Sequence, residues 1–192
     1  VTRSSFELGA SGSFDNYGTV RSSAPFSGSG AFVNHAGATF NGDLRMDAPS
    51  MRNDGLMRLS GRTNNLTGIG DIIVAGNGMQ LGGVTKQNAI TVGNNGTLQL
   101  NSFTSVGDQR VEADVTLERG AELRLTRGRP SMLFGDLVVE RKGAIEMDLA
   151  FSLTEPLLNA GRLLVEGTVF LASDSELVVR GPNPLRGPIL NI

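Results

Sequence analysis

The chain has no cysteine and only one histidine among its 192 residues. Without cysteine it cannot form disulfides, present a thiolate nucleophile or build the commonest structural zinc sites. A Ser-His-Asp arrangement would depend on His35, which precedes a glycine where we expect a solvated turn. A transition-metal site would have to rely almost wholly on carboxylates, and no acidic spacing supports one. The sequence therefore predicts no catalytic residue, no metal site and no cofactor.

Tryptophan is absent, tyrosine occurs once, and lysine is scarce beside arginine. Platforms on which sugar rings or bases could stack are correspondingly few. The formal net charge is -2, so no overall basic field attracts nucleic acid. No apolar run approaches the roughly 20 residues that a membrane-spanning helix needs. We expect neither a nucleic-acid partner nor membrane insertion of this segment.

Glycine, by contrast, is abundant, with 26 copies, and many of them recur within one short phrase. A hydrophobic residue and a polar residue, often Asn, precede the glycine, and an apolar, polar, apolar triplet follows it. Clear copies occupy residues 14–20, 51–59, 92–100 and 158–165, and weaker copies lie between them. The glycines, 18 to 24 residues apart and about 20 on average, are Gly18, Gly37, Gly55, Gly78, Gly96, Gly120, Gly143 and Gly161. This spacing is typical of stacked repeat architectures.

The triplets that follow the glycines have the period of a β-strand. In residues 98–100 and 123–125 two leucines flank a polar residue, so a strand would point both leucines to one face. The preceding Asn and Gly suit a corner, because both tolerate a positive backbone φ. One coil cannot bury its apolar face alone, whereas stacked coils build a continuous core.

The pattern therefore predicts an all-β, right-handed parallel β-helix that spans residues 1–192 as a single domain. We expect eight to nine coils of about 20 residues each. The glycines expected at one corner along the stack are Gly18, Gly55, Gly96, Gly143 and Gly161.

Several of these phrases resemble a known family. The Asn-x-Gly-Thr-Leu-x-Leu phrase of residues 94–100, the Gly-Ser-Gly of residues 28–30, the Gly-Ile-Gly-Asp-Ile of residues 68–72 and the missing cysteines are similar to β-helical passenger domains of bacterial autotransporters and haemagglutinin-like adhesins. The resemblance covers most of residues 14–179. It implies secretion to the bacterial surface, with any signal peptide and outer-membrane barrel outside this segment. The first residue is not Met and no signal peptide is visible, so we expect a fragment of a longer secreted protein.

Three aspartates are the candidates for carbohydrate chemistry, because a glycosidase needs two carboxylates that converge on one bond. Asp43, Asp71 and Asp136 each follow a glycine in a Gly-Asp-apolar phrase that we expect to open a strand. Equivalent residues on adjacent coils would be about 4.8 Å apart, but these three are not all on adjacent coils. Aspartate after glycine is commonly a turn residue that bonds its own backbone. A polysaccharide-degrading lyase or hydrolase remains an alternative.

The outer surface of the stack offers a candidate binding site. Alignment on the corner glycines gives an outward polar row, here called the stripe, formed by Arg21, Arg58, Gln80, Gln99, Arg124 and Glu146. A solenoid must expose some polar row whatever it does, so solvated decoration is one interpretation. The functional interpretation is multivalent binding, in which weak contacts along a rod add up.

These observations favour a non-enzymatic β-helical stalk or adhesin segment on a bacterial surface or in a secreted protein. Its expected partners are a host-surface glycan or protein, or sister molecules in self-association. The polysaccharide-degrading enzyme is one alternative, and a trimeric phage tail-fibre segment is another.

Overall fold

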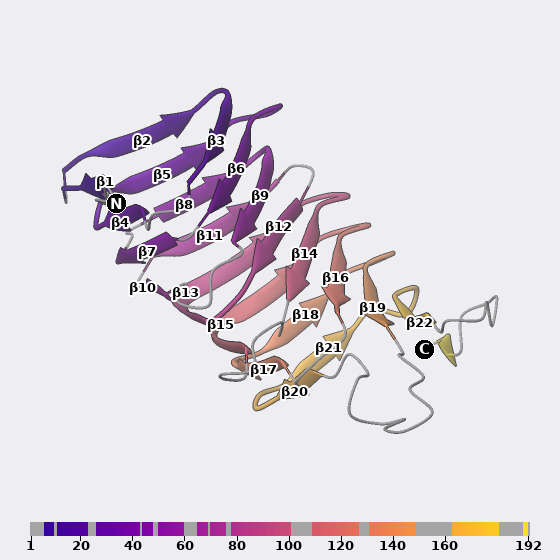
Figure 1. The fold of residues 1–192 in the computed structure, drawn as a ribbon. Coiled ribbons are helices and arrows are strands. Elements are labelled where there is room, and N and C mark those ends of the chain that lie inside the picture. The colour runs from indigo at the N-terminus through magenta and orange to yellow at the C-terminus, as the bar shows by residue number, and fades with distance from the viewer. Residues whose placement is uncertain are drawn as a thin grey trace, which may run out of the picture.

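The structure, a computed structural model, describes residues 6–9, 11–22, 26–42, 44–47, 50–59, 65–68, 70–75, 78–100, 109–126, 131–148, 163–180 and 190–191. Every regular element in these ranges is a β-strand. Figure 1 shows the strands stacked in order from the N-terminal to the C-terminal end, so the chain winds as a solenoid.

Each turn of the solenoid contributes strands to three series. The first series contains β1 (Phe6–Leu8), β4 (Phe26–Gly28), β7 (Leu44–Asp47), β10 (Asn65–Thr67), β17 (Ser131–Phe134) and β20 (Leu163–Val165). The second contains β2 (Ser13–Asn16), β5 (Ala31–Asn34), β8 (Ser50–Asn53), β11 (Asp71–Val74), β18 (Leu137–Val139) and β21 (Val169–Leu171). Two long strands, β13 (Val84–Val92) and β15 (Gln109–Leu117), belong to both series and join them into a 14-stranded sheet, sheet A.

The third series forms a separate 9-stranded sheet, sheet B. Its strands are β3 (Thr19–Arg21), β6 (Thr39–Gly42), β9 (Leu56–Leu59), β12 (Gly78–Leu81), β14 (Thr97–Leu100), β16 (Glu122–Leu125), β19 (Ala144–Asp148), β22 (Glu176–Arg180) and β23 (Leu190–Asn191). Neighbouring strands pair in parallel, except that β23 pairs antiparallel with β22.

The register of sheet B gives the length of a turn. One ladder of paired residues runs through Val20, Phe40, Met57, Met79, Leu98, Leu123, Ile145 and Leu177. Its steps lead from position 20 to position 177, so one turn takes ~22 residues, within the range of stacked repeats. The predicted parallel β-helix is thus confirmed. The turn is slightly longer than expected, and the number of turns is smaller than the eight to nine coils expected.

The core is the column of side chains enclosed by the three series. Sheet B strands such as β14 alternate between partly exposed and buried residues, and Leu98 and Leu100 point inward. In the N-terminal coils the column is aromatic, with Phe32 and Phe40 packed edge to face at a centroid distance of 5.2 Å. Each leucine or phenylalanine removed from water in this way contributes about 1.5–3 kcal/mol.

Four of the five predicted corner glycines lie where they were expected. Gly18, Gly55, Gly96 and Gly143 directly precede β3, β9, β14 and β19, which are strands of sheet B. Gly161 lies outside the described residues. The strand that follows it, β20, pairs with β17 in the first series of sheet A, so the predicted phase of this last repeat is wrong.

The expected positive φ is confirmed at some corners: it falls on the glycine at Gly37 and Gly120, and on the preceding residue at Asn95 and Lys142, with 58° for both. Gly55 has no positive φ, and there the glycine is needed for space. A Cβ on Gly55 would collide with the backbone oxygen of Ala38 and would lie 2.6 Å from that of His35, both on the preceding coil. Close approach of successive coils therefore selects glycine at this position.

Three asparagines beside these corners are buried. Asn16 donates from Nδ2 to Oδ1 of Asn34 at 2.7 Å, and Asn34 donates in the same way to Asn53 at 2.7 Å. Each Nδ2 also donates to a backbone carbonyl at the start of a sheet B strand, at 3.0–3.2 Å. The same row continues with Val74 and Val92, so an amide ladder gives way to an aliphatic one.

Candidate functional site

The six residues of the stripe share one row on the outside of sheet B. The register pairs Gln80 with Arg58 on one side and with Gln99 on the other, and it continues to Arg21 at one end and Glu146 at the other. Asn41 also belongs to this row, between Arg21 and Arg58. Alignment on glycines did not include Asn41, although Gly37 lies two residues before β6 just as Gly120 lies two residues before β16.

One end of the stripe differs from the expectation of an exposed row. Glu146 is only 5% exposed although it belongs to the outward row. It lies 3.4 Å from Nε of Arg124, so its carboxylate is paired with the neighbouring strand. The Glu146 carboxylate is therefore engaged within the protein and cannot contact a partner, whereas Arg21 and Arg58 can.

Arg124 is neutralised by its neighbours. Its Nη2 lies 3.1 Å from Oε2 of Glu122, in addition to the contact with Glu146. Partial burial lowers the pKa of Arg124, but the two carboxylates outweigh this effect and hold the pKa above its ordinary value. Arg124 is therefore a positioned cation whose charge is largely balanced within the molecule.

Arg58 and Gln80 are in the opposite situation. Arg58 is exposed and Gln80 is half-buried, and among the residues that the structure describes neither side chain has a hydrogen bond or ion pair. A free guanidinium presents five donors in a fixed fork, and a free carboxamide presents both donors and an acceptor. These two side chains are available to a ligand.

A concave site lies beside them on sheet B. It has a volume of about 200 Å³ and is here called the Gly78 notch. The notch exists because Gly78 pairs with Leu56 in an outward row and contributes no side chain there. The residues that line it are Leu56, Met57, Arg58, Gly78, Met79, Gln80, Thr97, Gln99 and Arg124.

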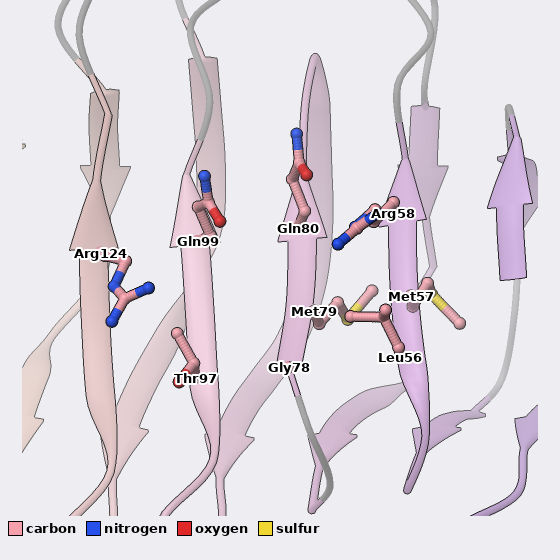
Figure 2. A pocket seen from close by; sticks show the side chains of 9 residues that line it. All are labelled: Leu56, Met57, Arg58, Gly78, Met79, Gln80, Thr97, Gln99 and Arg124. Carbon is pink, nitrogen blue, oxygen red and sulfur yellow. The ribbon is translucent and has the colours of Figure 1, made fainter. Parts of the chain in front are cut away.

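Figure 2 shows how the polar side chains surround the notch. Arg58 leans from β9 toward β12, and Arg124 leans from β16 toward β14. Gln80 and Gln99 stand between the two arginines on the two central strands. Four stripe residues on four consecutive strands thus form one wall of a single site, which the sequence did not reveal as a notch. One feature of the sequence could have indicated the notch. Gly78 is followed directly by the apolar, polar, apolar strand triplet, with no residue between them.

His35 has a structural environment on the N-terminal coils. Its Nε2 lies 2.9 Å from Oδ1 of Asp15, and its ring stacks on that of Tyr17 at a centroid distance of 3.9 Å and an interplanar angle of 7°. All three residues lie at or next to the corner between the second series and sheet B. The cluster joins two coils and is remote from the Gly78 notch along the chain.

The aspartates that were candidates for carbohydrate chemistry do not form one equivalent set. Asp71 begins β11 and Asp136 directly precedes β18, both in the second series. Asp43 lies outside the described residues, and the strand after it, β7, belongs to the first series. The prediction that the Gly-Asp phrase opens a strand is confirmed, but the prediction of equivalent positions is wrong for Asp43.

The bonds of these aspartates lie between coils. Oδ1 of Asp114 accepts the N–H of Asp136 at 2.9 Å, and Oδ1 of Asp136 accepts the N–H of Thr168 at 2.7 Å. Asp71 accepts a bond from the side chain of Asn88 at 2.9 Å. The expectation of a bond to the aspartate's own backbone is therefore corrected: Asp114 and Asp136 cap the backbone of the next coil.

Neither a metal cluster nor a membrane-spanning helix is found in the part of the chain that the structure describes. No three His, Cys, Asp or Glu side chains there come together as metal ligands. No helix there has the length and apolarity to cross a bilayer. The arrangement of the described surface therefore offers hydrogen bonds and one unpaired guanidinium at the Gly78 notch.

Comparison of the chain with family models, curated proteins and solved structures finds no match.

Proposed function

We propose that this chain is a non-enzymatic β-helical stalk or adhesin segment, displayed on a bacterial surface or secreted in the manner of an autotransporter passenger. The observation that carries the proposal is the stripe. It places polar side chains in register on consecutive strands of a rod. Adjacent strands are about 4.8 Å apart, so an extended partner along the rod can touch several of them at once.

Two further observations support a binding role over a polysaccharide-degrading one. The carboxylates of Asp114 and Asp136 accept backbone N–H groups of the neighbouring coil, which occupies them structurally. The Gly78 notch, in contrast, is lined by neutral and cationic polar groups without a carboxylate. A glycosidase needs two carboxyl groups that converge on one bond.

Adhesion of protein-coated beads to epithelial cells tests this function. A variant with Arg21, Arg58 and Arg124 changed to Ala should adhere several-fold less than the unchanged protein. The matched control changes Arg52, Arg119 and Arg141 to Ala, which removes the same charge from exposed positions off the stripe. Equal adhesion of the two variants would contradict the proposal.

A second measurement separates the alternatives. Incubation with neutral and acidic polysaccharides should release no reducing ends and no unsaturated products. Turnover that one carboxylate substitution abolishes would establish the enzyme instead. A stable trimer in sedimentation equilibrium would favour the tail-fibre alternative.

A further inference from the structure

The Gly78 notch combines features that select a particular ligand chemistry. At its rim is the guanidinium of Arg58, which is exposed and without a partner among the described residues. A guanidinium recognises a carboxylate through two parallel N–H to O bonds, and such charge-assisted bonds are roughly twice as strong as neutral ones. The rim is therefore suited to one carboxylate group.

We propose that the Gly78 notch binds one carboxylate-bearing sugar of an acidic polysaccharide whose chain runs along the solenoid axis, with the carboxylate on Arg58. The proposal rests on the binding function proposed above and names the ligand class of the stripe. Arg124, already balanced by Glu122 and Glu146, serves as a hydrogen-bond donor at the far side.

The other polar groups of the notch suit sugar hydroxyls. Gln80 and Gln99 stand between the two arginines, and Thr97 lies below Gln99 on the same strand (Figure 2). Carboxamides and hydroxyls both donate and accept, which matches the mixed character of sugar hydroxyl groups. Leu56, partly exposed in the outward row beside Gly78, supplies apolar surface against which the C–H face of a ring can pack.

The strand pairing argues against a peptide at this site. An extended peptide is commonly recognised by addition to a free sheet edge, where backbone groups are unpaired. Here β12 is paired with β9 on one side and β14 on the other, and β14 is paired with β16. The notch therefore offers a ligand side chains and no strand to extend.

The size of the notch indicates how much of the ligand it holds. Its volume of about 200 Å³ is below the roughly 300–1,000 Å³ of pockets that enclose a whole drug-sized ligand. One sugar ring is about as long as the spacing between two strands, so the rest of the chain would lie over neighbouring strands of the stripe. Affinity should then increase with oligosaccharide length.

Titration calorimetry with oligogalacturonate tests the proposal on the full chain. Arg58→Gln should weaken binding about tenfold or more, because it removes a charged bond but keeps an amide. Arg141→Gln, an exposed corner residue that loses the same charge, should change affinity less than twofold. Arg21→Gln, on the same stripe but two strands away from β9, should also have little effect. The methyl-ester form of the oligosaccharide, which lacks the carboxylates, should bind as weakly to the unchanged protein as the acid form does to Arg58→Gln.

The other outcomes each overturn a specific statement. Equal losses in Arg21→Gln and Arg58→Gln would refute the notch and leave a diffuse stripe with its adhesive function. Polyglutamate that binds as tightly, with the same dependence on Arg58, would refute the sugar. No heat with oligogalacturonate, while bead adhesion still depends on the stripe, would refute the ligand class alone. If neither oligogalacturonate binding nor stripe-dependent bead adhesion is observed, the proposed function is refuted.

Discussion

At the scale of single residues, the coil-to-coil distance decides which glycines the fold requires. Gly18 and Gly55 occupy the same position before their sheet B strands. A Cβ on Gly55 would meet backbone atoms of the preceding coil, whereas a Cβ on Gly18 would meet nothing within 4 Å. Neither residue has the positive φ that would itself strain a side chain. The two positions thus separate the cost of crowding from the cost of backbone conformation.

Gly55→Ala should destabilise the protein by about 2 kcal/mol or more, since backbone atoms cannot move aside as side chains can. Gly18→Ala should change the free energy of unfolding by less than about 0.5 kcal/mol. Urea denaturation followed by far-UV circular dichroism measures both. Equal effects would contradict the argument that crowding by the preceding coil requires glycine at position 55.

The asparagine ladder is the second residue-scale feature, and its members depend on one another. Asn34→Val should cost about 1–3 kcal/mol, because Oδ1 of Asn53 and the carbonyl of Leu56 lose their donor inside the core. The triple change of Asn16, Asn34 and Asn53 to Val matches the aliphatic row at Val74 and Val92.

The triple variant is the informative control for the ladder. Replacement of all side-chain partners by apolar groups removes the unpaired amide atoms, so its loss of stability should be clearly smaller than three times that of Asn34→Val. The same urea titration compares the variants. Strict additivity would show that each asparagine acts alone through its backbone contact.

At the scale of the strand, alternation fixes which face each residue presents. In β14, Leu98 is 1% exposed and points into the core, while the adjacent Gln99 lies on the stripe. Leu98→Asp should cost several kcal/mol through an unpaired buried charge and lower the midpoint of thermal unfolding markedly. Gln99→Asp should lower it only slightly. A small effect of Leu98→Asp would contradict the inward orientation of the ladder.

The alternation also explains what the sequence could and could not reveal about the elements. It predicted the parallel β-helix and the common row of the stripe, because both depend only on the two-residue period after a corner. The alternation could not show to which of the three series a given strand belongs. Residues 163–165 follow a glycine with the same apolar character as residues 98–100, yet β20 lies in sheet A. Every series faces the same core, so the same pattern suits all three.

Two features of the site needed the register between coils. The buried Glu146 is paired with Arg124 of the neighbouring strand. The two residues are a whole turn apart in the chain, so the sequence does not show that they are in contact. The notch depends on Gly78 lying beside Leu56 rather than at the corner with Gly55. Likewise, the asparagines resemble turn residues in sequence, and only the stack of coils shows that they bond one another.

At the scale of the whole molecule, the two ends of the stack are unlike each other. Among the described strands, β20 and β21 each pair on one side only, with β17 and β18. They expose large apolar side chains, with Leu164 51%, Val169 46% and Phe170 60% exposed. Sheet B is different at this end, since β22 is covered by the antiparallel strand β23. At the other end, β1 and β2 likewise have one described partner each, β4 and β5.

These ends predict weak head-to-tail association between copies of the chain. The strands β1 and β2 belong to the same series as β20 and β21, so a second copy can continue the parallel ladders of sheet A, while β23 blocks the corresponding pairing in sheet B. Analytical ultracentrifugation should show association that rises with concentration and changes little with salt, because ladder pairing and apolar contact are not chiefly ionic. Changing Val169 and Phe170 to Lys should abolish it, since charge on an edge strand opposes addition of another strand. The triple Ala variant of Arg21, Arg58 and Arg124 should associate like the unchanged protein. Association that weakens with salt and disappears in this triple variant would instead show that copies pack side by side through the stripe. A chain that stays monomeric at high concentration would show that the exposed edge of sheet A does not accept a second copy.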